Sequence, residues 1–441
     1  MDAYLHETYP LHKAAFLNDI QGLSLLMSEG GCDVDKQDPH GNTPLHIAVM
    51  KGHDHMTNLL LSKNCQVKIK NIHGWSPLME AVSVGNRTVI ANLLKKLKYQ
   101  AREHLTTRKP HLMKVLGQLD DFYMEIKWDF QSWVPLLSRV LPSDTCKIYK
   151  HGTALRMDTT LVDFNDRSWE RGDISFIYNP HVEHLKQHLV VLDNKLKKYQ
   201  RMKGSEIQRD LEEEVDVLMS TDIVSAQMST KPITFERTIS GWFFRAEKSD
   251  VVGNFTANYY NIDNLVLISK KRREHLTAED IKKNKTYLQS LTNGKHINDD
   301  ELKSMTHRTS LPPPVRKEVT WEEYINTPPS QYIHLGRPMD SKCTRRTFKA
   351  GVALSPEFPL GVKTLIDILE VIAPIKHMSK MRKFCEYKMP PGFPVRLEIP
   401  LLPTITAKVT FQKFQWCNNL SMKFFRIPRS YTEDPNRFPE L

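Results

Sequence analysis

Long hydrophobic runs are missing from this sequence. The first residues, MDAYLHETYP, contain no apolar core of the kind that a secretory signal peptide needs. Nowhere does the chain reach the roughly 18 consecutive apolar residues of a membrane-spanning helix. These absences argue against a secreted or membrane-spanning protein. Any association with a membrane is therefore expected to be peripheral and on the cytoplasmic side.

Cysteine is scarce as well, with six widely separated residues in 441. No Cys-x-x-Cys pair and no zinc-site spacing occurs among them. Scattered cysteines of this kind are typical of reduced, packed thiols in an intracellular protein. The sequence predicts neither a disulfide framework nor a bound metal.

The common catalytic motifs are missing too. There is no phosphate loop, no G-x-G-x-x-G, no G-x-S-x-G and no H-E-x-x-H. One cluster on a predicted helix has a spacing that could place three imidazoles on one face: His181, His184 and His188. The surrounding residues are polar, which favours a solvated helix face over a metal site. We predict a protein that is not an enzyme and that needs no cofactor, metal or small-molecule substrate.

Charge is unbalanced toward basic residues. Lysine and arginine total 62 against 51 acidic residues, a formal net charge of +11. An excess of this sign favours an anionic membrane surface or an acidic partner. The densest basic run, Lys270 to Arg273, is either a solvated segment or a localisation or lipid-binding patch.

What the sequence does contain is an internal repeat near its N-terminus. The segments YPLHKAAFLNDIQGLSLLM, TPLHIAVMKGHDHMTNLLL and SPLMEAVSVGNRTVIANLL align, and Leu11, Leu45 and Leu78 fall 34 and 33 residues apart. A period of about 33 with the motif T-P-L-H-x-A indicates ankyrin repeats. Residues 5–105 are predicted to form about three of them. Such stacks bind proteins through their loops and their concave helix face.

Single positions in the repeats have local physical roles. Thr43 is a natural N-cap for a helix that begins at Pro44, where a missing N–H costs nothing. Gly52 and, one repeat earlier, Asn18 suit a left-handed turn between paired helices. The third repeat uses the same devices at Ser76, Pro77 and Gly85. The C-terminal end of the stack needs a cover, which we assign to a capping helix or linker at 106–121.

Beyond residue 122 the sequence becomes strand-like. Runs such as FYMEIKWDF and CKIYKHGTALRMDTTLVDF alternate apolar and polar residues with period two, as antiparallel strands do. The predicted fold class is α+β, an all-α ankyrin solenoid followed by a larger antiparallel-sheet-rich α+β domain at 122–430. Residues 181–219 are predicted to be a charged helical insertion and 288–318 a flexible loop. The sequence leaves open whether the later region is one domain or two.

Candidate partner-binding residues come from both halves of the chain. Loops and turns of the repeats supply His40, His53 and His73, and predicted strands supply Trp242, Phe244 and Tyr259. For the aromatic residues, a place in the sheet core is the alternative. The acidic run that starts at Glu212 offers a different binding function, because it resembles the start of a ubiquitin-interacting helix. The positions where that helix needs Ala and Ser hold Leu218 and Asp222.

The short ankyrin stack and the later segments HGTALRMDTTLVDF, WERGDISFIY and GWFFRAEKSDVVGNFTANYYNIDNLVLISKKRREHL together resemble the ankyrin-repeat-domain thirteen family. The resemblance covers the chain from about Leu11 to about Pro428. It implies a molecular chaperone that binds newly made G-protein-coupled receptors at the endoplasmic reticulum, in the perinuclear cytoplasm, and regulates their folding and export. Nucleic acid is not an expected partner.

Members of this family differ in one respect that bears on function. Relatives of the A, B and D types carry C-terminal ubiquitin-interacting motifs and act in the endocytosis of ubiquitinated receptors. Such motifs are missing before Leu441. The resemblance therefore favours the C-type chaperone role, with a ubiquitin-dependent trafficking adaptor as the alternative.

Overall fold

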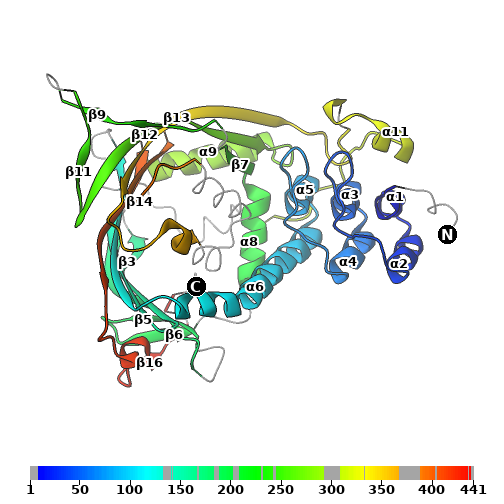
Figure 1. Ribbon diagram of the computed structural model, residues 1–441. Coiled ribbons are helices and arrows are strands. Elements are labelled where there is room, and N and C mark those ends of the chain that lie inside the picture. Colours follow the sequence, from blue (N-terminus) through cyan, green and yellow to red (C-terminus); the bar gives the residue numbers. More distant parts are fainter. Residues whose placement is uncertain are drawn as a thin grey trace. The chain divides into compact units, whose positions relative to one another are not determined.

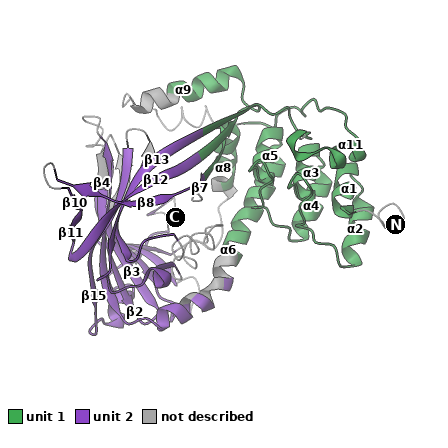
Figure 2. Cartoon of the chain, turned by 45° about the horizontal axis from the view of Figure 1, so that its top comes forward, with its two compact units in different colours: residues 1–103, 206–227, 268–344 green, residues 104–205, 228–267, 345–441 purple. Residues whose placement is uncertain are grey.

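The computed structural model describes residues 8–132, 141, 143–165, 168–182, 188–201, 208–229, 232–241, 245–292, 308–331, 333–366, 388–402, 405–435 and 437–438. The chain divides into two compact units (Figure 2). Unit 1 comprises residues 1–103, 206–227 and 268–344, and unit 2 comprises 104–205, 228–267 and 345–441. Two later segments thus belong to the same unit as the repeats. The linear division predicted at residues 105 and 122 is not the structural one.

Three helix pairs form the ankyrin part of unit 1 (Figure 1). The first pair is α1 (Pro10–Leu17) and α2 (Ile20–Ser28), the second α3 (Pro44–Lys51) and α4 (Asp54–Ser62), and the third α5 (Pro77–Val84) and the beginning of α6 (Arg87–Gly117). The all-α solenoid followed by a sheet-rich region confirms the predicted α+β class.

The local signals at the helix ends act as predicted. Pro44 and Pro77 open their helices, and the Ser76 hydroxyl accepts a hydrogen bond from the Met79 amide (3.4 Å). Asn18, Gly52 and Gly85 close the first helix of each pair in the left-handed conformation, with φ of 60°, 67° and 87°. These turns therefore follow from residue chemistry alone.

The stack has one continuous apolar core. Leu45 is 1% exposed, whereas the equivalent Leu78 is only partly buried. The core also includes residues from outside the repeats, among them Leu211, Val215, Met219, Trp321 and Tyr324.

Helix α8 (Gln208–Ser220) supplies the apolar contribution from the first of these segments. Its acidic side pairs with the third repeat, since Arg87 contacts Glu212 (2.6 Å) and Asp216, and Lys98 contacts Glu214. The segment 106–121, predicted to be a separate capping helix or linker, is not separate, because its residues up to Gly117 continue helix α6 of the third repeat. The cover of the third repeat within unit 1 is thus α8, and its acidic run and apolar face are both engaged there rather than presented to ubiquitin.

Further elements of unit 1 lie downstream. They include the beginning of β7 (Ile223–Ser229), the end of β12 (Phe255–Arg272), α9 (Ala278–Thr292), α11 (Trp321–Asn326) and a short 3-10 turn at Pro329–Gln331. Part of the predicted flexible loop, 293–307, lies outside the described residues. The part from 308 to 318 is described and is hydrogen-bonded to the repeats, as shown below.

Unit 2 is dominated by a mostly antiparallel sheet that has 14 strands within the described residues. Its main path runs β11-β12-β13-β14-β15-β1-β2-β3-β4-β5-β6-β16, with β7 and β8 also paired to β12. The bounds are β1 Phe122–Ser132, β2 Ser143–His151, β3 Ala154–Asn165, β4 Ser168–Tyr178, β5 Leu189–Asp193, β6 Lys198–Arg201, β8 Thr234–Arg237, β11 Ser249–Val252, β12 Phe255–Arg272, β13 Ser341–Ser355, β14 Phe393–Leu402, β15 Ile405–Trp416 and β16 Thr432–Glu433. A separate two-stranded sheet pairs β9 (Ile239–Ser240) with β10 (Ala246–Glu247).

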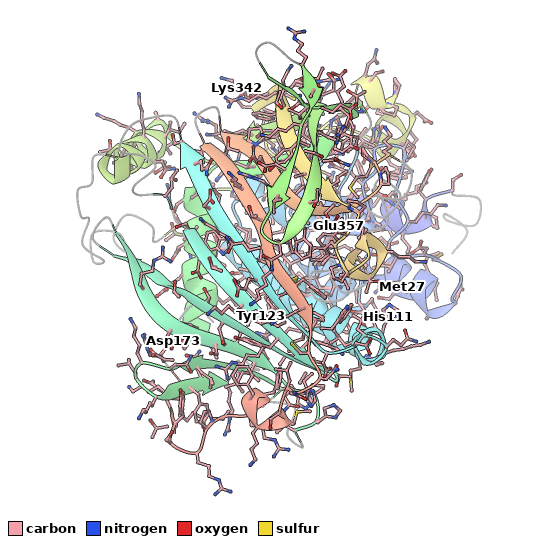
Figure 3. All side chains as sticks on the ribbon, turned by 60° about the vertical axis from the view of Figure 1, so that its left-hand side comes forward. Met27, His111, Tyr123, Asp173, Lys342 and Glu357 are labelled. Atoms are coloured by element: carbon pink, nitrogen blue, oxygen red, sulfur yellow. The ribbon has the colours of Figure 1, made fainter. Side chains whose placement is uncertain are left out.

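One face of the large sheet holds a cluster of aromatic rings. Phe358 stacks on Phe393 at a centroid separation of 3.9 Å and meets Phe411 edge-on at 5.7 Å. Elsewhere on the sheet, Tyr123 of β1 (Figure 3) lies 4.9 Å from the ring of Tyr149 on β2. The alternation of apolar and polar residues in these segments arises because successive side chains of a strand point to opposite faces of the sheet.

The predicted helical insertion at 181–219 is wrong for its first described half. Residues Leu189–Asp193 and Lys198–Arg201 form strands β5 and β6, joined by a tight turn in which Lys197 has φ of 53°. The run Leu189-Val190-Val191-Leu192 is short and rich in β-branched residues, which suits a buried strand better than a helix. Only α8, from Gln208, is helical as predicted.

The same region held the histidine cluster. His181 is hydrogen-bonded to Thr153 (2.7 Å), His188 contacts the carbonyl of Val182 (2.9 Å), and His184 lies outside the described residues. Among the described residues there is no group of three potential metal ligands. Across the same part of the chain, no helix is both long enough and apolar enough to span a membrane.

Candidate functional site on the inner face of the repeats

Two of the first helices of the repeat pairs, α1 and α3, are each tied by a histidine to the loop that follows the pair. The Nε2–H of His12 donates to the carbonyl of Asn42 (3.1 Å), and that of His46 donates to the carbonyl of Trp75 (3.1 Å). His46 also accepts the Thr43 amide on Nδ1 (3.1 Å), which fixes the ring. The His of the T-P-L-H motif is thus a structural hydrogen-bonding residue, as expected. We call the surface formed by α1, α3, α5 and their preceding loops the inner face.

The loops themselves are pre-organised. The Asp38 carboxylate accepts the amides of His40 and Asn42, both at 2.9 Å. One repeat later, Asn71 accepts the amides of His73 (3.1 Å) and Trp75 (3.0 Å), and its side-chain nitrogen donates to Asn42 (3.0 Å). These bonds lie within the loops themselves, so part of the order of each loop is local.

Residues 308–340, which we call the strap, pack against this inner face. Trp321 and Tyr324 of α11 are 3% and 0% exposed. Their rings lie 5.6 Å and 5.8 Å from the ring of Phe16. The Tyr324 hydroxyl donates to Asp38 (2.6 Å) and accepts from the Asn42 side chain (2.8 Å). Aromatic packing and a fully bonded hydroxyl together anchor the strap at the first two repeats.

A second set of anchors lies at the C-terminal ends of α3 and α5. Arg316 donates to the Met50 carbonyl (3.1 Å), and Arg337 donates to the carbonyls of Ser83 (2.9 Å) and Val84 (3.2 Å). Guanidinium groups suit this position because the last carbonyls of a helix lack intrahelical partners and carry partial negative charge. The strap thus satisfies helix ends that water would otherwise solvate.

The glycines that end α3 and α5 serve the strap as well as the turn. A Cβ on Gly52 would meet the guanidinium of Arg316 at 2.7 Å, and a Cβ on Gly85 would meet the side chain of Leu311 at 2.5 Å. The Leu311 amide also donates to the Gly85 carbonyl (2.9 Å). A side chain at position 85 would displace Leu311 of the strap, and one at position 52 would displace the end of the Arg316 side chain.

A buried ion cluster joins the inner face to a third part of unit 1. Arg272 contacts Glu80 (3.0 Å) and Glu274 (2.6 Å), and all three side chains are at most 5% exposed. Its guanidinium also lies 4.9 Å from the Trp75 ring. His334 of the strap contacts the same Glu80 oxygen at 3.0 Å.

Electrostatics keep Glu80 ionised in this cluster. Burial alone would raise the pKa of Glu80, but the charges of His334 and Arg272 and their hydrogen bonds hold it at about 2. Within the basic run that starts at Lys270, Arg272 is thus a buried residue rather than a solvated one. Lys270 donates to the His73 carbonyl (2.8 Å), and Lys271 and Arg273 pair with Asp222.

The three predicted repeat histidines occupy different positions. His40 is fully buried, and its Nε2–H donates to the Tyr324 carbonyl (2.9 Å). His53 donates from Nδ1 to the Ala15 carbonyl (2.9 Å), and burial lowers its pKa. His73 is half-buried, and burial lowers its pKa too. Two of these side chains are thus used inside unit 1, and whether a partner contacts any of the three stays a prediction.

Of the predicted aromatic residues, Trp242 and Phe244 lie outside the described residues. Tyr259 on β12 lines an opening of about 170 Å³ in unit 2. Lys248 lies 4.3 Å from its ring centroid, and Arg396 donates to its hydroxyl (3.3 Å). Glu398 borders the same opening and pairs with Arg396 (2.9 Å). A phenol placed between two cations suits contact with a polar or acidic group.

Sequence reasoning missed the strap. One local signal for it was present, because Thr320 and Glu323 form a capping box that starts α11, with bonds of 3.2 Å and 2.9 Å between side chains and amides. The contacts of Tyr324, nearly 300 residues from Asp38, had no local signal.

The fold defines a class of protein, one in which ankyrin repeats are joined to a large sheet, and ankyrin repeats imply interaction with other proteins. Comparison with known proteins agrees with that class and gives no positive indication of an enzyme. A family model described as "ANKRD13 C-terminal" matches residues 156–437, and one described as "Ankyrin repeats (3 copies)" matches 11–103. The chain belongs to the ANKRD13 family.

Several relatives match along nearly the whole chain. Mouse and human ankyrin repeat domain-containing protein 13C are each 51% identical over 98% of this chain and 79% of their own length. Human ankyrin repeat domain-containing protein 13B is 33% identical over 97% of this chain and 71% of its own length. These matches confirm the resemblance stated from the sequence, including its C-type character.

Proposed function

We propose that this chain is an escort for membrane receptors. In this role it binds newly made G-protein-coupled receptors at the cytoplasmic face of the endoplasmic reticulum and regulates their folding and export. Membership of the ANKRD13 family, on the side of the 13C relatives, supports the proposal. Nascent receptors present flexible cytosolic loops and tails, which a folded binding domain can hold until the receptor bundle has packed.

The observation that carries the assignment within the chain is the filled inner face. In an ankyrin stack this face is a common protein-binding surface, and here the strap covers it from Met50 to Val84. Client binding is therefore assigned to unit 2. Two features there fit a flexible client: the opening beside Tyr259, and strand β11 at one end of the described sheet, where Val251 is 64% exposed. An exposed strand edge can add an extended segment as a further strand.

The acidic helix bears on the alternative role. In a ubiquitin-dependent adaptor, an acidic helix needs an accessible apolar face. In α8 that face is buried, with Leu211 4% and Val215 0% exposed, and the acidic residues pair with Arg87 and Lys98. This arrangement favours the escort over an adaptor that binds ubiquitin through α8.

The test uses the full chain, because cutting after the repeats would strand α8 and the strap without the helices on which they pack. Cells express a tagged G-protein-coupled receptor with the wild-type chain, with Tyr259→Ala, or with Tyr99→Ala as the matched control. Tyr99 is a tyrosine of unit 1 that is 57% exposed. Endoplasmic reticulum membranes are washed at 1 M salt, where the Debye length is only about 3 Å and lipid-patch binding is screened.

We expect the receptor to retain the wild-type chain and the Tyr99 variant through the wash, and to retain less of the Tyr259 variant. Ubiquitin beads should capture none of them. Loss of all receptor association at high salt, or capture that depends on ubiquitin, would contradict the proposed function. Equal retention of the Tyr259 variant would remove that residue from the client site.

A further inference from the structure

The inner face has the properties of a peptide-binding groove that already contains a ligand. We propose that this groove accepts, from another protein, a segment with the chemistry of the strap. That segment is a short helix with aromatic side chains three residues apart, the second of them tyrosine, flanked by arginines. The strap then acts as a built-in competitor for the partner.

Part of the tyrosine pocket is held by bonds that do not involve the strap. The oxygens and nitrogens that meet the Tyr324 hydroxyl belong to Asp38 and Asn42, and these are fixed by bonds within the loops, to His40 and Asn71. A donor and an acceptor held in advance lose little freedom on binding, which raises affinity for whatever phenol enters. Phe16 of α1 provides the apolar wall beside it. The pocket therefore selects tyrosine over phenylalanine, because phenylalanine would leave Asp38 and Asn42 with unpaired polar atoms.

The arginine sites are equally general. Met50, Ser83 and Val84 present main-chain carbonyls at helix ends, and the glycines at 52 and 85 leave room for a chain to approach. Main-chain acceptors do not depend on which chain provides the guanidinium. The groove thus recognises two features of a ligand, its short aromatic helix and the arginines that flank it.

The strap is also suited to exchange. Helix α11 has six residues, too few to be stable alone in water, so it folds because the groove is there. Only one side of the strap is buried: Trp321 and Tyr324 face inward while Glu322 and Glu323 are exposed, and Val315 is 89% exposed. A partner with the same pattern would fold on the groove in the same way.

Competition sets how the binding should respond to mutation. When the competent state is a fraction of the population, the apparent dissociation constant rises by the inverse of that fraction. A tethered strap has an effective concentration of order millimolar, so it excludes weak partners. Weakening the strap through its own side chains, while the groove stays unaltered, should tighten binding of an added peptide.

The experiment uses the purified full chain and a fluorescein-labelled peptide that copies residues 314–340, with binding measured by anisotropy. The opened variant is Arg316→Ala with Arg337→Ala, which leaves the groove unaltered. Val315→Ala is the matched control on the exposed side of the strap. Circular dichroism checks that each chain is folded. If the double variant does not fold, Tyr324→Phe in the chain replaces it.

We expect the opened variant to bind the peptide at least about tenfold more tightly than wild type. The Val315 variant should behave as wild type. A peptide with Tyr324→Phe should bind the opened variant at least about fivefold more weakly than the unaltered peptide. The proposal is overturned if a folded, opened variant gains no affinity, or if the two peptides bind alike. The receptor test above does not involve this peptide, so the two proposals can fail separately.

Discussion

Replacing Arg272 should destabilise unit 1 far more than replacing its neighbour Lys271. The Arg272 guanidinium is 0% exposed and is a counter-charge for two buried carboxylates, Glu80 and Glu274, at 3.0 Å and 2.6 Å. Removing one partner of such a group leaves uncompensated buried charge, which typically costs about 3–5 kcal/mol. Lys271 is 38% exposed and pairs with Asp222 at the surface, a contact worth at most about 1 kcal/mol.

The assay is urea unfolding followed by far-ultraviolet circular dichroism for Arg272→Met and Lys271→Met. Arg272→Met should lower the free energy of unfolding by about 3 kcal/mol or more, and Lys271→Met by less than about 1 kcal/mol. Adding Glu80→Gln to Arg272→Met should recover part of the loss, because the stranded charge is then removed. Equal effects of the two single variants would refute the buried-cluster account and restore the interpretation of 270–273 as a solvated run.

Three further predictions concern pH, core packing and the sheet. Burial lowers the pKa of His12 from 6.5 to about 4, so between these pH values His12 is protonated in the unfolded chain and neutral in the folded chain. Stability should therefore fall as pH drops from about 6.5 to 4, by about 3 kcal/mol from this group, and His12→Gln should flatten the fall in an acid titration of unfolding free energy; an unchanged slope would contradict this. Leu45→Ala should cost about 2–5 kcal/mol in urea unfolding, whereas Leu78→Ala should cost clearly less because it is only partly buried, and the reverse order would count against the repeat packing. Gly253→Ala should lower the melting temperature, because φ is +60° and a Cβ would strike the Gln412 carbonyl; an unchanged melting temperature would mean that this turn does not lie against β15.

Features set by neighbouring residues could be predicted from the sequence. The N-cap Ser76 and the left-handed positions Asn18 and Gly52 are local choices with one good physical solution each. The alternating texture of β1 likewise predicted a strand where the structure has one.

Features set by distant residues could not. Glu80 meets Arg272 across 192 residues, and nothing around either residue signals the other. The prediction at Leu189–Asp193 failed for a different reason: the periodicity of a short apolar run does not separate a strand from a helix, and the β-branched residues that favour a strand were given too little weight. The strap was predictable only in part: the capping box of its short helix is a local signal, but the surface on which it packs is formed by distant residues.

The central claim is that the inner face of the repeats is occupied by the chain's own strap. Hydrogen–deuterium exchange of the full chain, read by mass spectrometry, measures this directly. The amides of Leu311, Tyr324 and Thr327 are hydrogen-bonded, to Gly85, Thr320 and Glu323 respectively.

Our account predicts that peptides covering 308–327 exchange much more slowly than an unstructured chain of the same sequence. It also predicts that Trp321→Ala accelerates exchange both there and in the loop at 38–42. Exchange of 308–327 at the unstructured rate in the wild-type chain, with α3 still protected, would contradict it.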